Sequence, residues 1–398
     1  MRTAVVVGAG VGGLAAAGAL ARSGWHVTLL ERGERLRGNG AALLLWPNGI
    51  RALEALGLGG GLGDIVFPMA AGGIRRPDGR WLVENGSQSG GDPVVVHADD
   101  LHDTLMAGLG EKIEIRTGVE VTTVRAGAGE RPAVGTAKHT YEADLIVAAD
   151  GSRSIIRRRL APQSVVASAG FAAWRAVIPW FRAPRLAESV PLCGEMLGAG
   201  QRFLHAMLGE RGSAASSTRG GIYWAATAPG APRPESAETQ LALLKRWFAD
   251  WQEPVAELLE ATQATDLVQQ AGEELRPLPG RFGFPVGIGG FALLGDAAHV
   301  ATPNLAQGAC LAFEDAATLR SLMQHAVPGR SLGAALNAYT DARRPRVARV
   351  AKVSRRLGLV LQAQGRLTVR ARDAALNRMP SRWLDRASMS SVDWTPPA

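Results

Sequence analysis

The chain begins with Thr3-Ala4-Val5-Val6-Val7-Gly8-Ala9-Gly10-Val11-Gly12-Gly13, and an apolar segment over residues 14–22 follows. Residues 3–7 are typical of a buried parallel strand, and residues 14–22 of the helix that the strand enters. Between them Gly8 permits a tight turn, Gly10 lets a pyrophosphate approach the backbone, and Gly13 lets the helix pack close to the strand. The N–H groups at the start of the helix favour an anion. This stretch therefore predicts a site for a phosphate-bearing cofactor.

An acidic residue stands at the distance that such a site requires. Residues 25–30 read as a second strand that ends at Glu31, 18 residues beyond Gly13. A carboxylate there accepts hydrogen bonds from ribose hydroxyls and disfavours a 2′-phosphate. Arg32 follows directly and is assigned to the same site. Strand, glycines, helix, strand and acid in this order predict a Rossmann-type domain.

Two later segments complete the predicted cofactor site. Asp150-Gly151 ends an apolar strand over residues 144–149, and Gly295-Asp296-Ala297-Ala298-His299 ends another over residues 290–294. The loop over residues 303–308 comes next, and its pairing with the first glycine segment points to FAD. The predicted cofactor-binding residues are Gly8, Gly10, Gly12, Gly13, Glu31, Arg32, Asp150, Gly151, Gly295, Asp296, Pro303, Ala306, Gln307 and Gly308.

Composition favours a soluble enzyme of two domains. The chain has 398 residues, of which 46% are hydrophobic, and shows no membrane-spanning stretch and no secretory signal. Cys193 and Cys310 form neither a metal pattern nor a disulfide framework, so we expect reduced thiols, no metal and a cytoplasmic location. The sequence leaves open whether the protein is a monomer or a homodimer.

The positive charge is concentrated near the C-terminus. The formal net charge is +8, and residues 343–382 hold eleven arginines and Lys352 against a single acid, Asp373. A solvated helix face or an intramolecular clamp explains this segment better than polyanion binding. No other feature resembles a nucleic-acid module, so we expect no nucleic-acid partner.

The fold class predicted is α/β: a Rossmann-type FAD-binding domain, a second mixed β-sheet domain for substrate, and a C-terminal helix. Residues 1–165 and 276–330 are assigned to a discontinuous FAD-binding domain, 166–275 to the substrate domain and 331–398 to a C-terminal helical region. Strands near residues 113–116, 120–124 and 136–141 are expected to form an antiparallel meander. One helix is expected from residue 332 to about residue 374.

These motifs resemble the flavoprotein aromatic hydroxylases of the p-hydroxybenzoate and salicylate hydroxylase type, over nearly the whole chain. The resemblance is carried by the first glycine segment with Glu31, by Asp150-Gly151, and by residues 295–316. It implies that Asp296 binds the ribityl or ribose part of FAD, and that Asp150-Gly151 serves both FAD and NAD(P)H. Residues 303–308 would present a helix N-terminus to the flavin, where a positive dipole end stabilises the negative charge of the reduced ring.

Two positions depart from the family pattern. Ala306 stands where glycine is usual, which adds a methyl group to a loop that approaches the flavin closely. Ala98 stands where the family commonly carries an arginine that contacts the FAD phosphate or ribityl region, so a charge-assisted contact is missing. Either FAD is held more weakly, or Arg35 or Arg37 substitutes for that arginine.

The resemblance implies a reaction as well as a cofactor. FAD would be reduced by NADH or NADPH, would capture O2 as a C4a-hydroperoxide, and would deliver one oxygen atom to an aromatic or polycyclic small molecule. Catalytic candidates are His205 as a base and Arg175 as a partner of a substrate carboxylate or phenolate, although packing and a structural ion pair are the alternatives. Three aromatic residues and one methionine lie close to His205 or Arg175 in the sequence. They would contact the substrate or else fill the core, and they are Trp174, Phe203, Met207 and Trp224.

Other activities fit the same motifs. Alkene epoxidation, Baeyer-Villiger insertion and flavin-dependent reduction without oxygen transfer share the scaffold and stay open as alternatives. Halogenation is disfavoured because residues 173–179 lack the Gly-Trp-x-Trp-x-Ile-Pro segment of flavin-dependent halogenases. A non-enzymatic flavin sensor is the least favoured alternative, since sensing does not require a second sheet.

Overall fold

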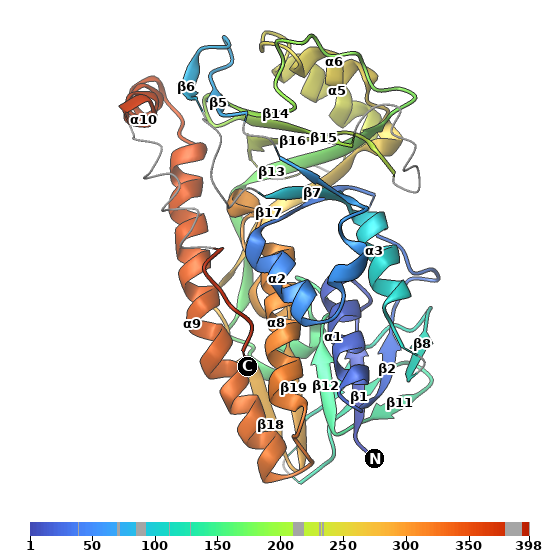
Figure 1. Ribbon diagram of the computed structural model, residues 1–398. Coiled ribbons are helices and arrows are strands. Elements are labelled where there is room, and N and C mark those ends of the chain that lie inside the picture. Colours follow the sequence, from blue (N-terminus) through green and yellow to red (C-terminus); the bar gives the residue numbers. More distant parts are fainter. Residues whose placement is uncertain are drawn as a thin grey trace.

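The computed structural model describes residues 1–38, 40–69, 72–84, 93–110, 112–127, 129–209, 219–230, 232, 235–378 and 392–397. These residues form two large sheets at opposite ends of an elongated molecule, and a long helix runs along one side (Figure 1). The predicted α/β architecture, with a Rossmann-type domain and a second mixed sheet, is confirmed.

The first sheet has the order β18-β19-β12-β1-β2-β8. Every neighbouring pair is parallel except β18 with β19. The strand bounds are β1 (Thr3–Val7), β2 (His26–Leu30), β8 (Ile113–Arg116), β12 (Leu145–Ala148), β18 (Gly283–Val286) and β19 (Gly289–Leu293). The run of apolar residues in β1 and β12 reflects burial on both faces, as parallel sheets require.

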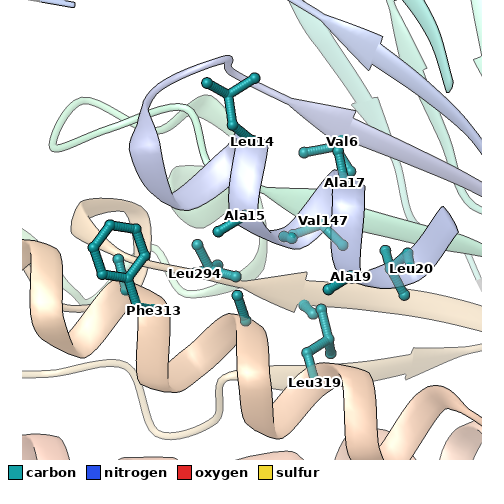
Figure 2. Close-up of a cluster of buried hydrophobic side chains, with 14 of the residues drawn as sticks. Val6, Leu14, Ala15, Ala17, Ala19, Leu20, Val147, Leu294, Phe313 and Leu319 are labelled. Carbon is teal, nitrogen blue, oxygen red and sulfur yellow. The ribbon is translucent and has the colours of Figure 1, made fainter. Parts of the chain in front are cut away.

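Helix α1 (Val11–Arg22) packs on this sheet and against α8 (Gly308–Met323). Figure 2 shows the small side chains Ala15 and Ala19 of α1 turned toward Leu294 and Leu319. Because alanine occupies little space, the two helices approach closely, and both begin at the cofactor motifs. This core therefore holds the glycine segment and the start of α8 in one rigid unit.

The second sheet has the order β17-β13-β16-β15-β14-β5-β6. Its bounds are β5 (Ile74–Arg75), β6 (Trp81–Val83), β13 (Val165–Pro179), β14 (Cys193–Leu197), β15 (Arg202–Leu208), β16 (Gly221–Pro229) and β17 (Val268–Arg276). Helices α5 (Ala237–Trp247) and α6 (Val255–Ala261) cover one face (Figure 1). The other face packs on a small sheet of β3 (Ala42–Leu45), β7 (Val94–His97) and β4 (Val66–Pro68).

Two strands of the second sheet, β5 and β6, lie outside the predicted substrate domain of residues 166–275. The expected meander also differs in part. The strand over residues 113–116 is β8, which pairs in parallel with β2, so its expected place in the meander was wrong. The antiparallel sheet consists instead of β9 (Thr123–Arg125), β10 (Ala133–Gly135) and β11 (Thr140–Glu142).

The C-terminal segment forms two helices rather than one. Helix α9 (Arg330–Leu361) contains Pro345, and α10 (Arg366–Arg378) begins after a turn in which Gly365 has a φ of +83°. Helix α9 ends at Leu361 with Gln362 as its C-cap, and Gly365 lies in the turn that separates it from α10, where the left-handed backbone favours glycine. Other helices are α2 (Pro47–Ala55), α3 (Ala98–Ala107), α4 (Ile155–Leu160) and α7 (Asp296–His299). Among the described residues, no helix is long and apolar enough to cross a membrane.

Candidate cofactor and substrate site

The glycine segment packs tightly on one side and is open on the other. Gly8 has a φ of +103°, and a Cβ at Gly13 would lie 1.9 Å from the Gly8 carbonyl oxygen. A Cβ at Gly10, in contrast, would meet no atom within 4 Å. The loop therefore leaves free space at the N-terminus of α1, where phosphate groups bind favourably.

Glu31 lies at the end of β2, as predicted, and holds the glycine segment in place. Its carboxylate accepts hydrogen bonds from the backbone N–H of Ala9 and of Gly33, both at 2.8 Å. A carboxylate oxygen accepts more than one hydrogen bond, so Glu31 can also receive ribose hydroxyls. Arg32 is exposed beside it.

Asp150 and Gly151 face the same region from β12. One Asp150 oxygen, Oδ2, accepts from the Ile155 N–H at 2.9 Å, and the other, Oδ1, is buried without a partner. Burial raises the pKa of Asp150, against the hydrogen bonds that lower it. An unpartnered carboxylate oxygen of this kind indicates a place where a ligand donates a hydrogen bond.

Arg157 links the Asp150 segment to the segment that begins at Gly295. It is the first of three consecutive arginines and is not predicted from the sequence as a site residue. It is 1% exposed, and its guanidinium donates to the Ser152 carbonyl at 2.5 Å and to the Ala297 carbonyl at 3.1 Å. The Asp150 segment and α7 are thereby fixed relative to each other. Its neighbour Arg158 is exposed, so the two arginines differ in burial, which the sequence does not reveal.

Asp296 is the first residue of α7 and is exposed to solvent. The protein atoms around its carboxylate raise its pKa by desolvation, opposed by the positive charges of His299, Arg175 and Arg157. His299 is buried instead: its Nε2 lies 2.6 Å from an Asp315 oxygen, which assigns it a structural contact.

The loop over residues 303–308 turns into α8 as predicted. Ala306 is the one described non-glycine residue with a positive φ, +50°. The Trp46 indole donates to the Leu305 carbonyl at 3.0 Å, and Asn48 Nδ2 donates to Gln307 Oε1 at 2.9 Å. Both amides keep a buried atom without a partner, Asn48 Oδ1 and Gln307 Nε2. Polar groups here are thus available to a bound ligand.

The backbone at Ala306 gives a testable consequence. A left-handed conformation costs a residue with a Cβ about 1 kcal/mol relative to glycine. We expect Ala306→Gly to raise the free energy of unfolding by about that amount and to retain FAD. Denaturant unfolding followed by tryptophan fluorescence measures it. Ala309→Gly, inside the first turn of α8, is the matched control and is expected to lower the free energy of unfolding; the same sign for both variants would contradict the explanation.

The two remaining sequence questions concern Ala98 and Cys310. Ala98 begins α3 and is 2% exposed, and Arg35 and Arg37 are both exposed on the surface. That Arg35 or Arg37 substitutes for the missing arginine stays a prediction.

Cys310 is fully buried against Gly49, where a Cβ would lie 2.7 Å from the Cys310 sulfur. Burial raises the pKa of the Cys310 thiol to about 12, which fits a packing residue and an unreactive thiol.

The predicted aromatic contacts to substrate lie on the helix-covered face of the second sheet. Trp224 is fully buried, with its ring centroid 5.4 Å from that of Phe203, and Trp174 donates to Gln240 of α5 at 2.9 Å. Met207 packs on the same cluster beneath α5 and α6. The geometry corrects this part of the sequence prediction, because rings packed under helices have no free face for a ligand.

His205 lies on that same face, because it pairs with Trp224. It is 3% exposed, its Nε2 is 3.0 Å from the Pro191 carbonyl oxygen, and burial lowers its pKa. The predicted role as a base is corrected likewise, because the imidazole is enclosed on the helix-covered face of the sheet.

Arg175 occupies the opposite face, toward the first domain. It pairs with Ala225 and donates to Gln270 at 3.0 Å, while its Nε is buried without a partner. Burial raises the pKa of both Asp296 and Tyr223, and the positive charge of Arg175 opposes both shifts, so its guanidinium lies near the cofactor motif. Thr227 Oγ1, on the same face, is also buried and unpartnered. Thr227 is not predicted from the sequence; the strand register, which places it on the same face as Arg175, identifies it.

These residues fit FAD. The open side of Gly10 and the Glu31 carboxylate suit a pyrophosphate and a ribose, and Asp296 with the loop over residues 303–308 suits the ribityl chain and the flavin ring. The described residues contain no group of three or more His, Cys, Asp or Glu side chains that could hold a metal ion.

Comparison with known proteins agrees with this geometry. A family described as "FAD binding domain" matches residues 1–354. The chain is 30% identical to an aurachin C monooxygenase/isomerase of Stigmatella aurantiaca, over 99% of this chain and 98% of that protein. It is 30% identical to an FAD-dependent urate hydroxylase of Klebsiella pneumoniae, over 86% of each. The solved structure of Klebsiella pneumoniae HpxO with FAD and uric acid superimposes with a TM-score of 0.81, at 25% identity over 98% of this chain and 96% of that one. The chain belongs to the FAD-binding family and, within it, to the FAD-dependent aromatic monooxygenases.

Proposed function

We propose that the protein uses NADH or NADPH and O2 to insert one oxygen atom into an aromatic or polycyclic small molecule. The observation that carries the proposal is the position of Arg175, a cation with a buried unpartnered Nε that faces the cofactor motif at Asp296. Bound FAD supplies the redox chemistry and the reactive oxygen. The relatives' printed activities, urate hydroxylation among them, support the same reaction type.

Arg175 is the group that we assign to an oxygen of the substrate. A partly buried guanidinium whose Nε has no partner favours an anionic or strongly polarised oxygen, such as a phenolate, enolate or carboxylate. Electron density pushed into a ring by such an oxygen makes the neighbouring carbon more reactive toward an electrophilic oxygen atom. Burial raises the pKa of Tyr223, against the charges of Arg175 and Arg202, so its neutral hydroxyl is available as a second donor.

Apolar side chains pack this face of the sheet and would keep water away from a substrate beside Arg175. Val177, Ala206 and Leu208 of the second sheet cluster there with Val95 of β7 and Ala42 of β3. Exclusion of water protects the reactive oxygen species from unproductive decay to hydrogen peroxide. The chain has no separate second Rossmann domain among its described residues, which fits transient binding of the nicotinamide donor at the surface.

The experiment follows NADH and NADPH oxidation, O2 uptake and peroxide together across hydroxybenzoates, purines and 4-quinolones. We expect one compound class to accelerate flavin reduction and to gain one atom of 18O from 18O2 while peroxide stays low. Substrate reduction without incorporation of 18O would replace the proposal with a flavin reductase. An epoxide or a ring-expanded product would retain oxygen transfer and change the class of product.

Arg175→Met tests the assigned residue. Loss of one charge-assisted hydrogen bond to a buried partner costs about 1.5–3 kcal/mol, so we expect the KM for an anionic substrate to rise at least about 10-fold. FAD content should not change, because Arg175 lies on the second sheet. Arg185→Met removes an equal charge at an exposed position and serves as the control. An unchanged KM in Arg175→Met would exclude the assigned contact.

A further inference from the structure

The corner between α9 and α10 exposes apolar side chains. Leu359 is 75% exposed, Val360 43% and Leu367 80%, within a span of nine residues. Large aliphatic side chains this exposed and this close together are uncommon on a protein surface that contacts only water. In Figure 1 the upper end of α9 and all of α10 lie at the outer edge of the molecule, beside β6.

The same corner is strongly basic. Residues 343–372 contain nine arginines and Lys352 and no acidic residue. Four of these arginines form ion pairs with carboxylates: Arg343 and Arg346 with Glu314, Arg355 with Glu274, and Arg372 with Asp373. The outward cations are exposed, and they are Arg349, Lys352, Arg356, Arg366 and Arg370.

Spacing along the helices places charge and apolar surface together. Lys352, Arg356 and Leu359 follow one another at four and three residues, so they share one exposed stripe of α9. Leu367 and Arg370 repeat the arrangement on α10, whose other side packs through Leu376 against the second sheet. Residues 352–370 on this outer side are here termed the basic corner.

We propose that the basic corner binds the headgroup region of an anionic phospholipid membrane. Arginine and lysine side chains attract anionic headgroups, and leucines beside them enter the boundary between headgroups and acyl chains. No shape complementarity is needed, which suits side chains that project singly from a convex corner. The inference concerns the surface of the protein and is independent of the reaction proposed above.

A second copy of the chain is a poorer occupant. A two-fold interface brings the same surface of both subunits together, so the exposed cations of one would face those of the other. The absence of acidic residues in residues 343–372 leaves nothing within this segment to compensate that repulsion. An anionic lipid surface supplies the missing charge.

The test is co-sedimentation of the FAD-loaded protein with vesicles of phosphatidylcholine alone or with added phosphatidylglycerol. We expect binding only with phosphatidylglycerol, weakened by salt. Arg356→Glu/Arg370→Glu should weaken it at least about 30-fold, and Leu359→Ser/Leu367→Ser should weaken it without changing net charge. Arg185→Glu/Arg246→Glu changes net charge equally at exposed positions elsewhere and is the matched control.

Equal binding to both vesicle types, or equal loss in the control variant, would overturn the proposal. Light scattering coupled to size-exclusion chromatography supplies a second readout. A wild-type dimer that becomes a monomer in Leu359→Ser/Leu367→Ser would instead assign the corner to contact between copies. Circular dichroism and FAD content establish that each variant is folded.

Discussion

Gly13→Ala is expected to purify without bound FAD. The new Cβ would lie 1.9 Å from the Gly8 carbonyl oxygen and 3.0 Å from its carbon, both of them backbone atoms that cannot rotate away. Helix α1 must therefore move away from β1, which widens the phosphate-binding loop. Overpacking of this kind lowers the free energy of unfolding by about 1–3 kcal/mol. The ratio of flavin absorbance to protein absorbance and the thermal midpoint measure the two effects.

Two variants of the same region separate steric crowding from general damage. Gly18→Ala, also within α1, meets the flexible Arg22 side chain at 3.2 Å and Leu109 Cδ2 at 3.4 Å, and it is expected to keep full FAD and equal or higher stability. Gly10→Ala adds a methyl group in open space, so the apoprotein should stay as stable while FAD binds more weakly. If Gly13→Ala remained yellow with an unchanged midpoint, the close approach of helix and strand would not matter for the cofactor.

Arg343→Met is expected to destabilise the protein by about 3–5 kcal/mol, because it removes the buried cation that pairs with the carboxylates of both Glu314 and Asp315. Arg343 is 1% exposed, donates to Glu314 at 2.6 Å and donates to Asp315 at 2.7 Å. Denaturant unfolding measures the loss. Arg344→Met is the control, because it removes the same charge one residue along α9. The Arg344 side chain donates to the Pro279 carbonyl, so its loss should lower the free energy of unfolding by about 1 kcal/mol or less.

The cost at Arg343 should depend on pH. Burial alone would raise the pKa of Asp315, but the charges of His299 and Arg343 lower it overall. A carboxyl with a lowered folded-state pKa stabilises the fold above its unfolded pKa, about 3.9, and loses that contribution as pH falls through the folded value. The difference between wild type and Arg343→Met should thus be full at neutral pH and shrink below about pH 4. A difference independent of pH would assign the effect to packing.

The motifs assigned to the cofactor could be found in the sequence because each of them is local. Gly8, Gly10 and Gly13 are required by one turn and the start of one helix. The position of Glu31 is set by the length of that helix and of the strand after it. The structure adds what local patterns do not contain, such as the bridge from Arg157 to Ala297. That contact depends on which loop of the fold lies beside α7.

The face of the second sheet that we propose for the substrate was not predictable, because both faces of β15 are apolar. Phe203 and Met207 alternate with Leu204 and Leu208, and period-two alternation separates the faces without saying which of them helices cover. Aromatic residues suggested a ligand-binding face, whereas the space beneath α5 and α6 needed large rings to fill it. Strand pairing, which places Arg175 opposite Ala225, was the missing information.

Strand β19 carries a consequence for how the protein is made. It pairs with β12, which ends at Ala148, yet β19 begins only at Gly289. During synthesis, the growing sheet around β1 therefore presents the unpaired edge of β12 while the strands β13 to β17 of the second sheet are translated. Such distant pairing slows folding and leaves a strand edge available to other nascent chains. We expect refolding yield to fall steeply with protein concentration, and a truncated chain that ends before β19 to aggregate rather than accumulate as a soluble nucleotide-binding domain.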